Sequence, residues 1–525
     1  MKIVGLSFGG HDSSYAIFEN GVLLVHEELE RHSRTKEDDG DIIQFYIDRH
    51  GSFDDVDIVA HTNNGEKTEF GRRKQSWHII EKLRDEGKLE VVQVGHQRSH
   101  AANAFFSSNF LNAMIFTIDG GGWDEEPNGP GGPFPSSWSV WVGEDTKIHP
   151  KQFRYDFNVG VMWNTVTEQV YNMSGGGPPY GCQAGTVMAM AAMGNPDIYF
   201  DDFLSSGPLG VGWRSMDFPK YANLDEQGKF DFAASLQKYT EHCLRNEMSK
   251  WIQPETEYIC LSGGVALNSV MTGKIQSWFP QIKDVYIPPV PYDGGLAIGN
   301  AQHVLHQIQD LPRTKWEDNA PPYLGLPYSK EEVFNALEEA DGISYEKATI
   351  NDVCKLLHDE KIVSVFSGGS ESGRRALGNR SILADPTNPK IKDIVNEKVK
   401  HRQWFRPFAP SILREEVSNW FTSDKSSPYM GFVLKFKEDM RDKVPGVVHF
   451  DGSARLQTVT EKDNKWYYNF LKEWNAVSGV PIILNTSFND REPIVERPEH
   501  AINCFKGTNI DYLYFVDNEI LVRKV

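Results

Sequence analysis

The feature that most constrains the fold of this chain is a strand–glycine turn–strand unit that occurs twice. In the first unit the β-rich run KIVGLSF leads into the turn GGHDSS, and YAIFENGVLLVHEE then alternates apolar and polar residues around a turn at Asn20-Gly21. In the second unit AMIFTID leads into three glycines, and SWSVWVGE follows after a segment rich in glycine and proline. The pattern predicts either one duplicated fold or two unrelated hairpins.

Strands and helices alternate between and after these units, which predicts an α/β class. Helices are expected in GHQRSHAANAFFSS, QAGTVMAMAAMG and DFAASLQKYTEHCLRNEMSKWI, and a strand, glycine turn and helix in both EYICLSGGVALNS and VYIPPVPYDGGLAIGNAQHVLHQI. Periodicity is lost and prolines gather in residues 308–330, where we place the main linker. We therefore expect one domain over residues 1–320 and a second α/β domain over residues 331–525. The second domain is expected to contain a helix at KEEVFNALEEA and strands at KIVSVF, VPIILNTS and YLYFVDNEILV.

The distribution of charge limits the partners of the chain. Its 525 residues include 54 Lys and Arg against 73 Asp and Glu, and because residues 341–525 are nearly neutral, the acidic excess lies in the first 340. Such a surface repels nucleic acid and anionic lipid, so a nucleic-acid partner is not expected. Residues 367–414 form a basic island whose expected ligand is a small polyanion such as a phosphate ester, although a solvated basic surface fits equally well.

The cysteines and the hydropathy pattern indicate a soluble protein of a reducing compartment. The five cysteines are scattered without a CxxC pair, which argues against a disulfide framework and against a cysteine-rich zinc site. No run approaches the ~18 apolar residues that a membrane span needs, and the N-terminus turns polar too early for a secretory signal. We predict a cytoplasmic protein without a membrane partner, and the sequence leaves monomer and homodimer both open.

Two histidines and two aspartates predict a metal site. His96 and His100 stand at i and i+4 of an expected helix, so both imidazoles leave the same face. Asp119 and Asp293 each end an expected strand before a glycine turn, where α/β domains place ligands. Two imidazoles and two carboxylates suit Fe²⁺, Mn²⁺ or Zn²⁺. Two ordinary helix histidines and two turn-forming aspartates are the alternative interpretation.

The glycine turns GGHDSS, DGGG, LSGGVALNS and YDGG predict a nucleotide-phosphate site. Glycine lets backbone N–H groups approach phosphate oxygens, and three of the four turns lead towards expected helix N-termini. The chain has no GxxxxGK[ST] loop and no GxGxxG, so a P-loop or dinucleotide site is not expected. The candidate nucleotide-binding residues in these turns are Asp12, Gly120, Gly121, Gly263, Gly264 and Asn268.

The basic island carries cations among glycine, alanine, proline and aromatic residues. They are Arg375, Arg380, Lys400, Arg402 and Arg406. This is not the lysine–glutamate mixture of a solvated helix, and guanidinium groups beside a glycine-rich turn suit bidentate binding of a phosphate or a carboxyl-like group. DGSARLQTV adds Arg455, and LNTSFND adds the polar run Asn485, Thr486, Ser487 and Asn489. This run is either a binder of a planar amide or a plain strand-to-loop turn.

Several motifs together resemble those of a known family. HDSS, the HxxxH pair, IDGGG, SGGVALN, YDGG, RALGNRSILADP, WFRPFAPSIL, DGSAR and LNTSFN follow one another in the order found in the NodU/CmcH carbamoyltransferase family. The resemblance covers nearly the whole chain. It implies an actin/hexokinase-like duplicated ATPase-fold domain, similar to the kinase-like enzyme of threonylcarbamoyl-tRNA synthesis, followed by a YrdC-like α/β domain.

The resemblance also implies a reaction. Members carbamoylate hydroxyl groups of small molecules such as sugars or antibiotic precursors, with carbamoyl phosphate, ATP and Mg²⁺. The YrdC-like domain would form carbamoyl-adenylate and pyrophosphate, with Arg375, Lys400, Arg406 and Arg455 on the phosphates and Arg380 assisting. The adenylate would pass to the large domain, where an Fe²⁺-like ion would bind at the two histidines and two aspartates. His11 is the candidate general base for the acceptor hydroxyl.

The sequence departs from the family pattern at three positions. Gly369 stands where the family usually has arginine, Arg374 where it has proline, and Thr186 where a lysine is common. These departures leave the acceptor undefined, and we expect its specificity in the insertion Trp123–Ser137 and the loop Asp202–Asp217.

Two other functions remain open at this point. One is carbamoylation of a hydroxymethylated nucleobase, or another RNA or nucleotide modification, which the acidic first domain disfavours. The other is an actin-like ATP-binding regulatory module, which would not need the arginine-rich second domain.

Overall fold

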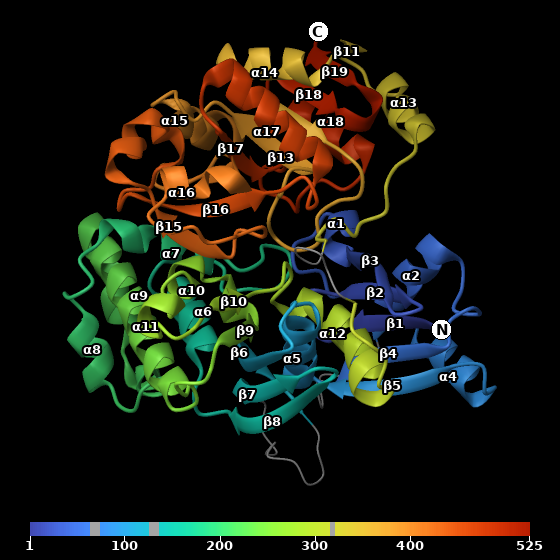
Figure 1. Ribbon diagram of the computed structural model, residues 1–525, viewed down its shortest axis with the longest axis vertical. Coiled ribbons are helices and arrows are strands. Elements are labelled where there is room, and N and C mark those ends of the chain that lie inside the picture. The colour runs from blue at the N-terminus through green and yellow to red at the C-terminus, as the bar shows by residue number, and fades with distance from the viewer. Residues whose placement is uncertain (64–73, 125–135, 315–320) are drawn as a thin grey trace. The chain divides into compact units, whose positions relative to one another are not determined.

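The computed structural model describes residues 1–63, 74–124, 136–314 and 321–525 (Figure 1). The central part of the insertion Trp123–Ser137, where acceptor specificity is predicted, lies outside the described residues. The chain divides into two compact units, Met1–Ala320 and Pro321–Val525. Among the helices that the structure describes, none is both long and apolar enough to cross a bilayer.

The first half of unit 1 is built on a five-stranded sheet in the order β3-β2-β1-β4-β5. Strands β1, β2 and β3 form antiparallel pairs, and β4 and β5 continue the sheet in parallel with β1. The φ angles of Asn20 (50°) and Gly21 (84°) are both positive, as a two-residue turn between antiparallel strands requires. Its elements are β1 (Lys2–Ser7), β2 (Ser14–Glu19), β3 (Val22–Glu28), α1 (Leu29–Ser33), α2 (Ile42–His50), β4 (Ile58–Asn63), α4 (Trp77–Asp85), β5 (Glu90–Gly95) and α5 (His96–Phe106).

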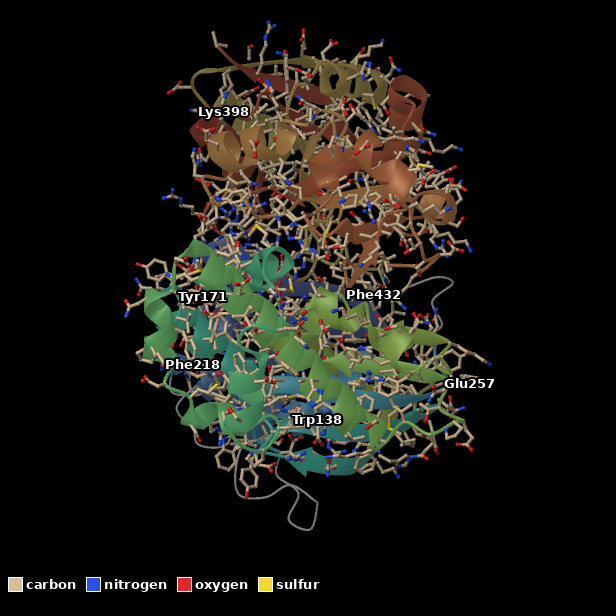
Figure 2. The ribbon with its side chains drawn as sticks, turned by 90° about the vertical axis from the view of Figure 1, so that its left-hand side faces the viewer. Trp138, Tyr171, Phe218, Glu257, Lys398 and Phe432 are labelled. Atoms are coloured by element: carbon tan, nitrogen blue, oxygen red, sulfur yellow. The ribbon has the colours of Figure 1, made fainter. Side chains whose placement is uncertain are left out.

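The second half repeats this sheet in the order β10-β9-β6-β7-β8, with the same strand directions. Trp138 on β7 is fully buried in the core of this half (Figure 2). The elements are β6 (Asn112–Gly122), β7 (Ser136–Glu144), β8 (Lys147–Arg154), α6 (Val159–Gln169), α7 (Ala184–Met190), α8 (Phe200–Ser205), α9 (Glu226–Ser249), β9 (Tyr258–Ser262), α10 (Ser269–Thr272), α11 (Ile275–Trp278), β10 (Asp284–Tyr286) and α12 (Leu296–Gln302). The repetition of the five-stranded sheet confirms the predicted duplication of the fold in unit 1.

The two halves exchange their last helices. α12 packs against β1, β2 and β4 of the first sheet, while α5 packs against β6, β7 and β9 of the second, and Figure 1 shows the two helices next to each other. Asn300 on α12 fixes this junction, since its side-chain NH₂ donates to the Leu6 carbonyl at 2.9 Å and to Thr62 Oγ1 at 2.8 Å, and its oxygen accepts from Ser99 on α5. The exchange brings the start of α5 close to the turn before α12, and the candidate metal ligands lie there.

A buried ionic network around Glu27 ties β3 to α1 and α2. The Glu27 carboxylate contacts Arg49 at 3.1 and 3.2 Å and His32 Nε2 at 3.3 Å, and it accepts a hydrogen bond from Tyr15. Burial alone would raise the pKa of Glu27, but His32 and Arg49 outweigh burial and lower it to about 2. Because the folded pKa lies below its ordinary value of 4.5, the charged network stabilises the fold above about pH 4.5 and loses this contribution as the pH falls towards 2.

We expect Glu27→Gln to lower the free energy of unfolding of unit 1 by about 3 kcal/mol at neutral pH, because it leaves the partly buried Arg49 guanidinium without this carboxylate. The variant should also lose less stability between pH 4.5 and pH 2 than the wild type. Thermal unfolding followed by circular dichroism over this range measures both effects. Asp55→Asn is the matched control, since Asp55 is an exposed partner of Lys2 and should change stability by less than about 1 kcal/mol. Equal losses in the two variants would contradict the prediction.

Unit 2 is built on one nine-stranded sheet in the order β11-β19-β18-β12-β13-β17-β14-β16-β15. Ser329 and Thr349 begin its first two helices with capping boxes, in which each side chain bonds the backbone three residues on. Phe432 in edge strand β15 is labelled in Figure 2. The likeness of this unit to YrdC stays a prediction.

The elements of unit 2 are α13 (Lys330–Glu338), β11 (Ile343–Lys347), α14 (Ile350–His358), β12 (Val363–Phe366), β13 (Arg380–Ala384), α15 (Ile391–Ile394), β14 (Ala409–Leu413), α16 (Val417–Trp420), β15 (Phe432–Lys435), β16 (Ser453–Val459), α17 (Lys465–Ser478), β17 (Ile482–Ser487), α18 (Pro498–Gly507), β18 (Tyr512–Phe515) and β19 (Ile520–Lys524).

Candidate metal centre and anion site

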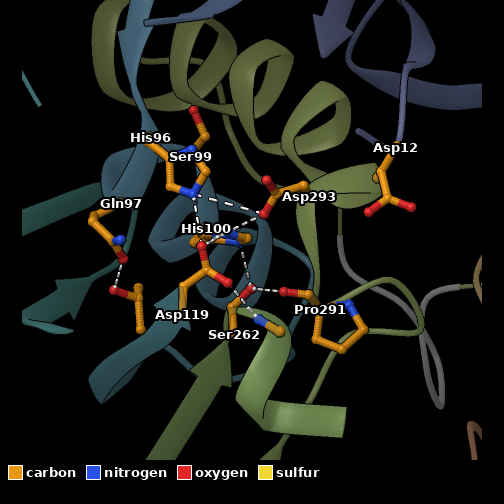
Figure 3. A network of polar contacts seen from close by, with 12 residues as sticks. Asp12, His96, Gln97, Ser99, His100, Asp119, Ser262, Pro291 and Asp293 are labelled. Atoms are coloured by element: carbon orange, nitrogen blue, oxygen red, sulfur yellow. Dashed lines mark hydrogen bonds and ion pairs between the residues drawn. The ribbon is translucent and has the colours of Figure 1, made fainter. Parts of the chain in front are cut away.

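The four predicted metal ligands of unit 1 lie together (Figure 3). His96 and His100 project from the first turns of α5, Asp119 from β6, and Asp293 from the turn before α12. Their ligand atoms all lie within 4.8 Å of one another. The Nε2 atom of His96 lies 3.0 Å from an Asp119 oxygen and 3.7 Å from an Asp293 oxygen. For His100 Nε2 the corresponding distances are 3.8 and 3.4 Å.

His100 is oriented by a partner outside this group. Its Nδ1 lies 3.3 Å from the Ser262 hydroxyl at the end of β9, and that hydroxyl donates to the Pro291 carbonyl at 2.9 Å. The opposite ring nitrogen, Nε2, is buried and makes no hydrogen bond within the described residues, although it faces two carboxylates. A buried nitrogen in that position is what a histidine ligand of a metal presents, with its other nitrogen fixed by a second group.

Asp119 is held by the glycine turn after β9. Its second carboxylate oxygen accepts a hydrogen bond from the Gly264 N–H at 3.0 Å. Gly263 has a φ of 92°, and a Cβ at this position would lie 2.2 Å from the Ile118 carbonyl oxygen, so only glycine permits the turn. The LSGG motif thus serves to position Asp119, and its glycine N–H groups are directed at Asp119 and the Pro291 carbonyl.

The charges of the cluster favour a cation. Burial lowers the pKa of His100, but the neighbouring carboxylates of Asp119 and Asp293 outweigh burial and raise it to about 9. Burial would raise the pKa of Asp119, yet the two histidines hold it well below its ordinary range. Two carboxylates kept ionised in a buried site beside an unsatisfied imidazole nitrogen fit a divalent cation. Within the described part of unit 1, this donor set therefore fits the metal that the motifs imply.

His11 and Asp12 lie at the edge of this cluster. The Asp12 carboxylate accepts from His11 Nδ1 at 2.8 Å, and His11 Nε2 lies 3.8 Å from Asp293. Desolvation lowers the pKa of the His11 ring, but Asp12 and Asp293 outweigh this effect and raise the pKa to about 10. The half-exposed ring is thus oriented by Asp12 and carries a proton while the two carboxylates are its neighbours. The role of His11 as a general base stays a prediction.

The other predicted nucleotide ligands of unit 1 make contacts inside the chain. The Gly120 carbonyl accepts from Asn158 at 2.8 Å, and the Gly121 N–H points back to Asp119 at 3.5 Å. Asn268 caps α10 through the Met271 N–H and pairs side chain to side chain with Gln237 at 2.9 Å. Their binding to phosphate stays a prediction, and in the structure they stabilise the turns around the cluster.

Unit 2 contains a cluster of four arginines whose positive charges act on one another. They are Arg375, Arg402, Arg406 and Arg455, which come from three separate segments. Burial lowers the pKa of the Arg455 guanidinium well below its ordinary value, and the positive charges of the other three lower it further. The Arg455 Nε is buried without a hydrogen-bond partner in the described residues. A bound anion would relieve both the repulsion and the unsatisfied donor.

Glu371 shapes the turn that carries Arg375. One of its carboxylate oxygens accepts the N–H groups of Leu377 and Asn379, both at 2.7 Å, and of Arg380 at 3.1 Å. The turn is thus folded around a buried anion. The glutamate of the ExGxRALGNR motif was not predicted as a site residue, although its place in the motif was the available signal.

Arg380 and Lys400 are bound mainly to backbone oxygens. The Arg380 guanidinium is fully buried over the Phe366 ring and donates to the Ser367 carbonyl at 2.6 Å and the Gly368 carbonyl at 3.1 Å. The Lys400 ammonium donates to the carbonyls of Ser487 at 2.9 Å and of Asn489 at 2.6 Å. Both side chains therefore hold loops together in the structure. Their predicted contact with phosphate stays a prediction.

Asn485 lies beneath the arginine-bearing turn. Its side-chain NH₂ donates to the Ala376 carbonyl at 3.1 Å, to Ser411 at 3.0 Å and to Gln457 at 2.9 Å. The Ser487 hydroxyl donates to the Asn489 side chain at 2.8 Å, so these two residues pair with each other beside Lys400. The structure thus brings the LNTSFN motif to the basic cluster as a buried support.

One departure from the family pattern has a physical reason. A Cβ at Gly369 would lie 2.1 Å from the Gly325 carbonyl oxygen, because the segment after Pro321 packs on this loop and Gly325 N–H bonds the Ser370 carbonyl at 3.1 Å. An arginine would not fit at 369 without moving that segment. Arg374 lies partly buried in the turn shaped by Glu371, and Thr186 is buried in α7.

Comparisons with known proteins match both units. Residues 68–302 match the family model "Carbamoyltransferase N-terminus", and residues 354–524 match "Carbamoyltransferase C-terminus". The nodulation protein NolNO of Sinorhizobium fredii is 30% identical over 98% of this chain and 79% of its own length. The chain belongs to the NodU/CmcH carbamoyltransferase family.

Other relatives extend over similar lengths. NolO of Bradyrhizobium diazoefficiens is 32% identical over 82% of this chain and 79% of its own. An uncharacterized Synechocystis protein, sll1178, is 30% identical over 99% of this chain and 96% of its own. Among solved structures, T. kodakarensis HypF aligns with 59% of this carbamoyltransferase and 48% of its own chain, at 14% identity and a TM-score of 0.36.

Proposed function

We propose that this carbamoyltransferase uses carbamoyl phosphate and ATP to carbamoylate a hydroxyl group of a small molecule. The observation that carries the proposal is the guanidinium cluster of unit 2, in which burial and the charges of Arg375, Arg402 and Arg406 disfavour the charge of Arg455, and the buried Arg455 Nε has no hydrogen-bond partner among the described residues. Family membership supplies the carbamoyl chemistry, and the duplicated ATPase fold of unit 1 supplies a second site with two buried carboxylates.

In unit 2 the proposed reaction forms carbamoyl-adenylate. Water cleaves carbamoyl phosphate to carbamate and phosphate, a carbamate oxygen attacks the α-phosphorus of ATP, and pyrophosphate leaves. Mg²⁺ accompanies the nucleotide. Arg375, Arg406 and Arg455 would bind the phosphoryl oxygens and stabilise the charge that shifts onto the leaving pyrophosphate.

In unit 1 the acceptor hydroxyl would attack the carbamoyl carbon, its C–O bond would form, and AMP would leave with the electrons of the broken mixed-anhydride bond. We propose that His11, oriented by Asp12, accepts the proton of the acceptor hydroxyl as general base, once a cation bound at the cluster offsets the carboxylate charge that keeps the ring protonated. A divalent ion held by His96, His100, Asp119 and Asp293, with Fe²⁺ as the expected metal, would supply positive charge for the nucleotide phosphate. A buried site also protects the labile mixed anhydride from water.

Pyrophosphate release tests the proposal before the acceptor is known. Purified protein is given ATP, Mg²⁺ and carbamoyl phosphate, and each is omitted in turn. We expect release only when all three are present, because the carbamate that attacks ATP comes from carbamoyl phosphate. Acetyl phosphate is the matched control, since it has a similar size and charge but yields no carbamate.

Release that does not depend on carbamoyl phosphate would contradict the proposal. ADP and phosphate as the products, in place of AMP-linked product and pyrophosphate, would favour an ATP-binding regulatory module. Retention on nucleic acid at physiological salt would favour the nucleobase alternative.

A further inference from the structure

Two aromatic side chains of unit 2 form an exposed corner. Trp404 is 51% exposed and Phe450 is 50% exposed, although both rings are large and apolar. Their centroids lie 5.7 Å apart and the ring planes meet at 88°. The Lys392 ammonium lies 4.8 Å from the Phe450 centroid, on the same corner. Half-exposed rings at a right angle offer one open face and one wall to a flat ligand.

The turn that carries Trp404 is rigid. The buried Asn396 side chain donates to the carbonyls of Trp404 at 3.2 Å and Arg406 at 3.0 Å, and its oxygen accepts from Arg402 at 2.8 Å. One buried amide thus bonds the backbone at Trp404 and Arg406 and holds the Arg402 side chain. The aromatic corner is therefore preformed, which reduces the entropic cost of binding.

The corner and the guanidinium cluster share one segment of the chain. Trp404 stands two residues from Arg402 and two residues from Arg406, and both arginines belong to the cluster around Arg455. A ligand that occupies both features has a flat aromatic part and a polyanionic part. ATP has this composition. Carbamoyl phosphate is small and polar, and it has no aromatic group that could stack on the rings.

We propose that the corner of Trp404 and Phe450 binds the adenine base of ATP, with the base stacked on the indole and its phosphates towards Arg406 and Arg455. The inference rests on the proposed adenylate-forming function and adds the base-binding residues of that site. A platform for another protein surface is the competing use of such a corner. It would leave ATP affinity independent of Trp404.

Kinetics of pyrophosphate release separate base from phosphate recognition. We expect Trp404→Ala to raise the KM for ATP about tenfold, as loss of a base-stacking ring does in other nucleotide sites. The Ki of tripolyphosphate, which has no base, should stay unchanged. Arg455→Ala should weaken both ATP and tripolyphosphate. Tyr345→Ala is the matched control, since Tyr345 is an aromatic residue exposed by 40% on β11, and it should change neither constant.

Trp404→Phe keeps a ring at the position and should retain most of the ATP affinity. An unchanged KM for ATP in Trp404→Ala would overturn the inference and leave the proposed function standing. An equal loss of ATP and tripolyphosphate would also overturn it, because the indole would then act on the arginines and not on the base. Wild-type protein that releases no pyrophosphate would contradict the proposed function, and the inference would fall with it.

Discussion

Replacing His100 by alanine is expected to lower carbamoyl transfer to the acceptor by more than a hundredfold while pyrophosphate release in unit 2 continues. His100 is fully buried, and its Nε2 faces both Asp119 and Asp293 without a hydrogen bond among the described residues. Loss of a group that merely supports a metal ligand costs about 10- to 100-fold in affinity or activity, so loss of the ligand itself should cost more.

Metal content and two activities check this expectation. Elemental analysis of purified protein should show bound metal in the wild type and little in His100→Ala. His149→Ala is the matched control, because His149 is exposed on β8 and lies outside the cluster. Circular dichroism shows whether the variants are folded. Metal retained by His100→Ala would refute the assignment of the four ligands, and normal acceptor carbamoylation by a variant that has lost its metal would refute a role of the ion in transfer.

The metal cluster could be predicted from the sequence because its geometry is local. The spacing of His96 and His100 fixes one helix face, and Asp119 lies near the end of the expected strand, β6. The expectation that Asp293 ends a strand was wrong, because β10 ends at Tyr286 and Asp293 begins the turn that leads into α12. The supporting contacts of the cluster were not predictable in this way. Ser262 reaches His100 across 162 positions of the chain, and only the packed fold shows that contact.

The roles of the basic residues could not be read from their types. Arg375, Arg380 and Lys400 all stand in motifs, yet a guanidinium or ammonium serves a ligand or a backbone carbonyl equally well. The structure distinguishes the basic residues by their partners. Arg380 and Lys400 donate to backbone carbonyl oxygens, whereas the Nε of Arg455 has no partner in the described part of unit 2. This distinction depends on tertiary contacts, which cannot be inferred from a sequence motif.

The fold of unit 1 was predicted through its repeated hairpins and not through its sheets. The parallel strands β4 and β5 complete the first sheet, although their short apolar runs gave no distinct signal. The exchange of α5 and α12 between the halves is likewise a long-range property. It decides which strand ends meet, so the sequence predicted the ligands but not the packing that unites them.

Arg455→Met is expected to lower pyrophosphate release by about a hundredfold or more, because a charge-assisted donor to the reacting phosphates is lost. The same change should leave the thermal stability of unit 2 unaltered or raise it. The pKa of Arg455 lies below its ordinary value, so the folded protein disfavours the charge of this side chain, and removing that charge relieves repulsion from Arg375, Arg402 and Arg406. Arg455→Lys should restore only part of the rate, since an ammonium cannot bind phosphate in a bidentate manner.

Arg380→Met is expected to lower stability more directly than activity, which is the reverse of the effect expected for Arg455→Met. It leaves the buried carbonyls of Ser367 and Gly368 without their donors, so it should destabilise unit 2 by about 3 kcal/mol. The rate of pyrophosphate release should fall only in proportion to the fraction of the variant that is unfolded. Thermal unfolding and steady-state kinetics of the two variants, measured side by side, therefore separate an arginine that binds substrate from one that holds the fold. A destabilised Arg455→Met, or a stable but inactive Arg380→Met, would reverse the two assignments.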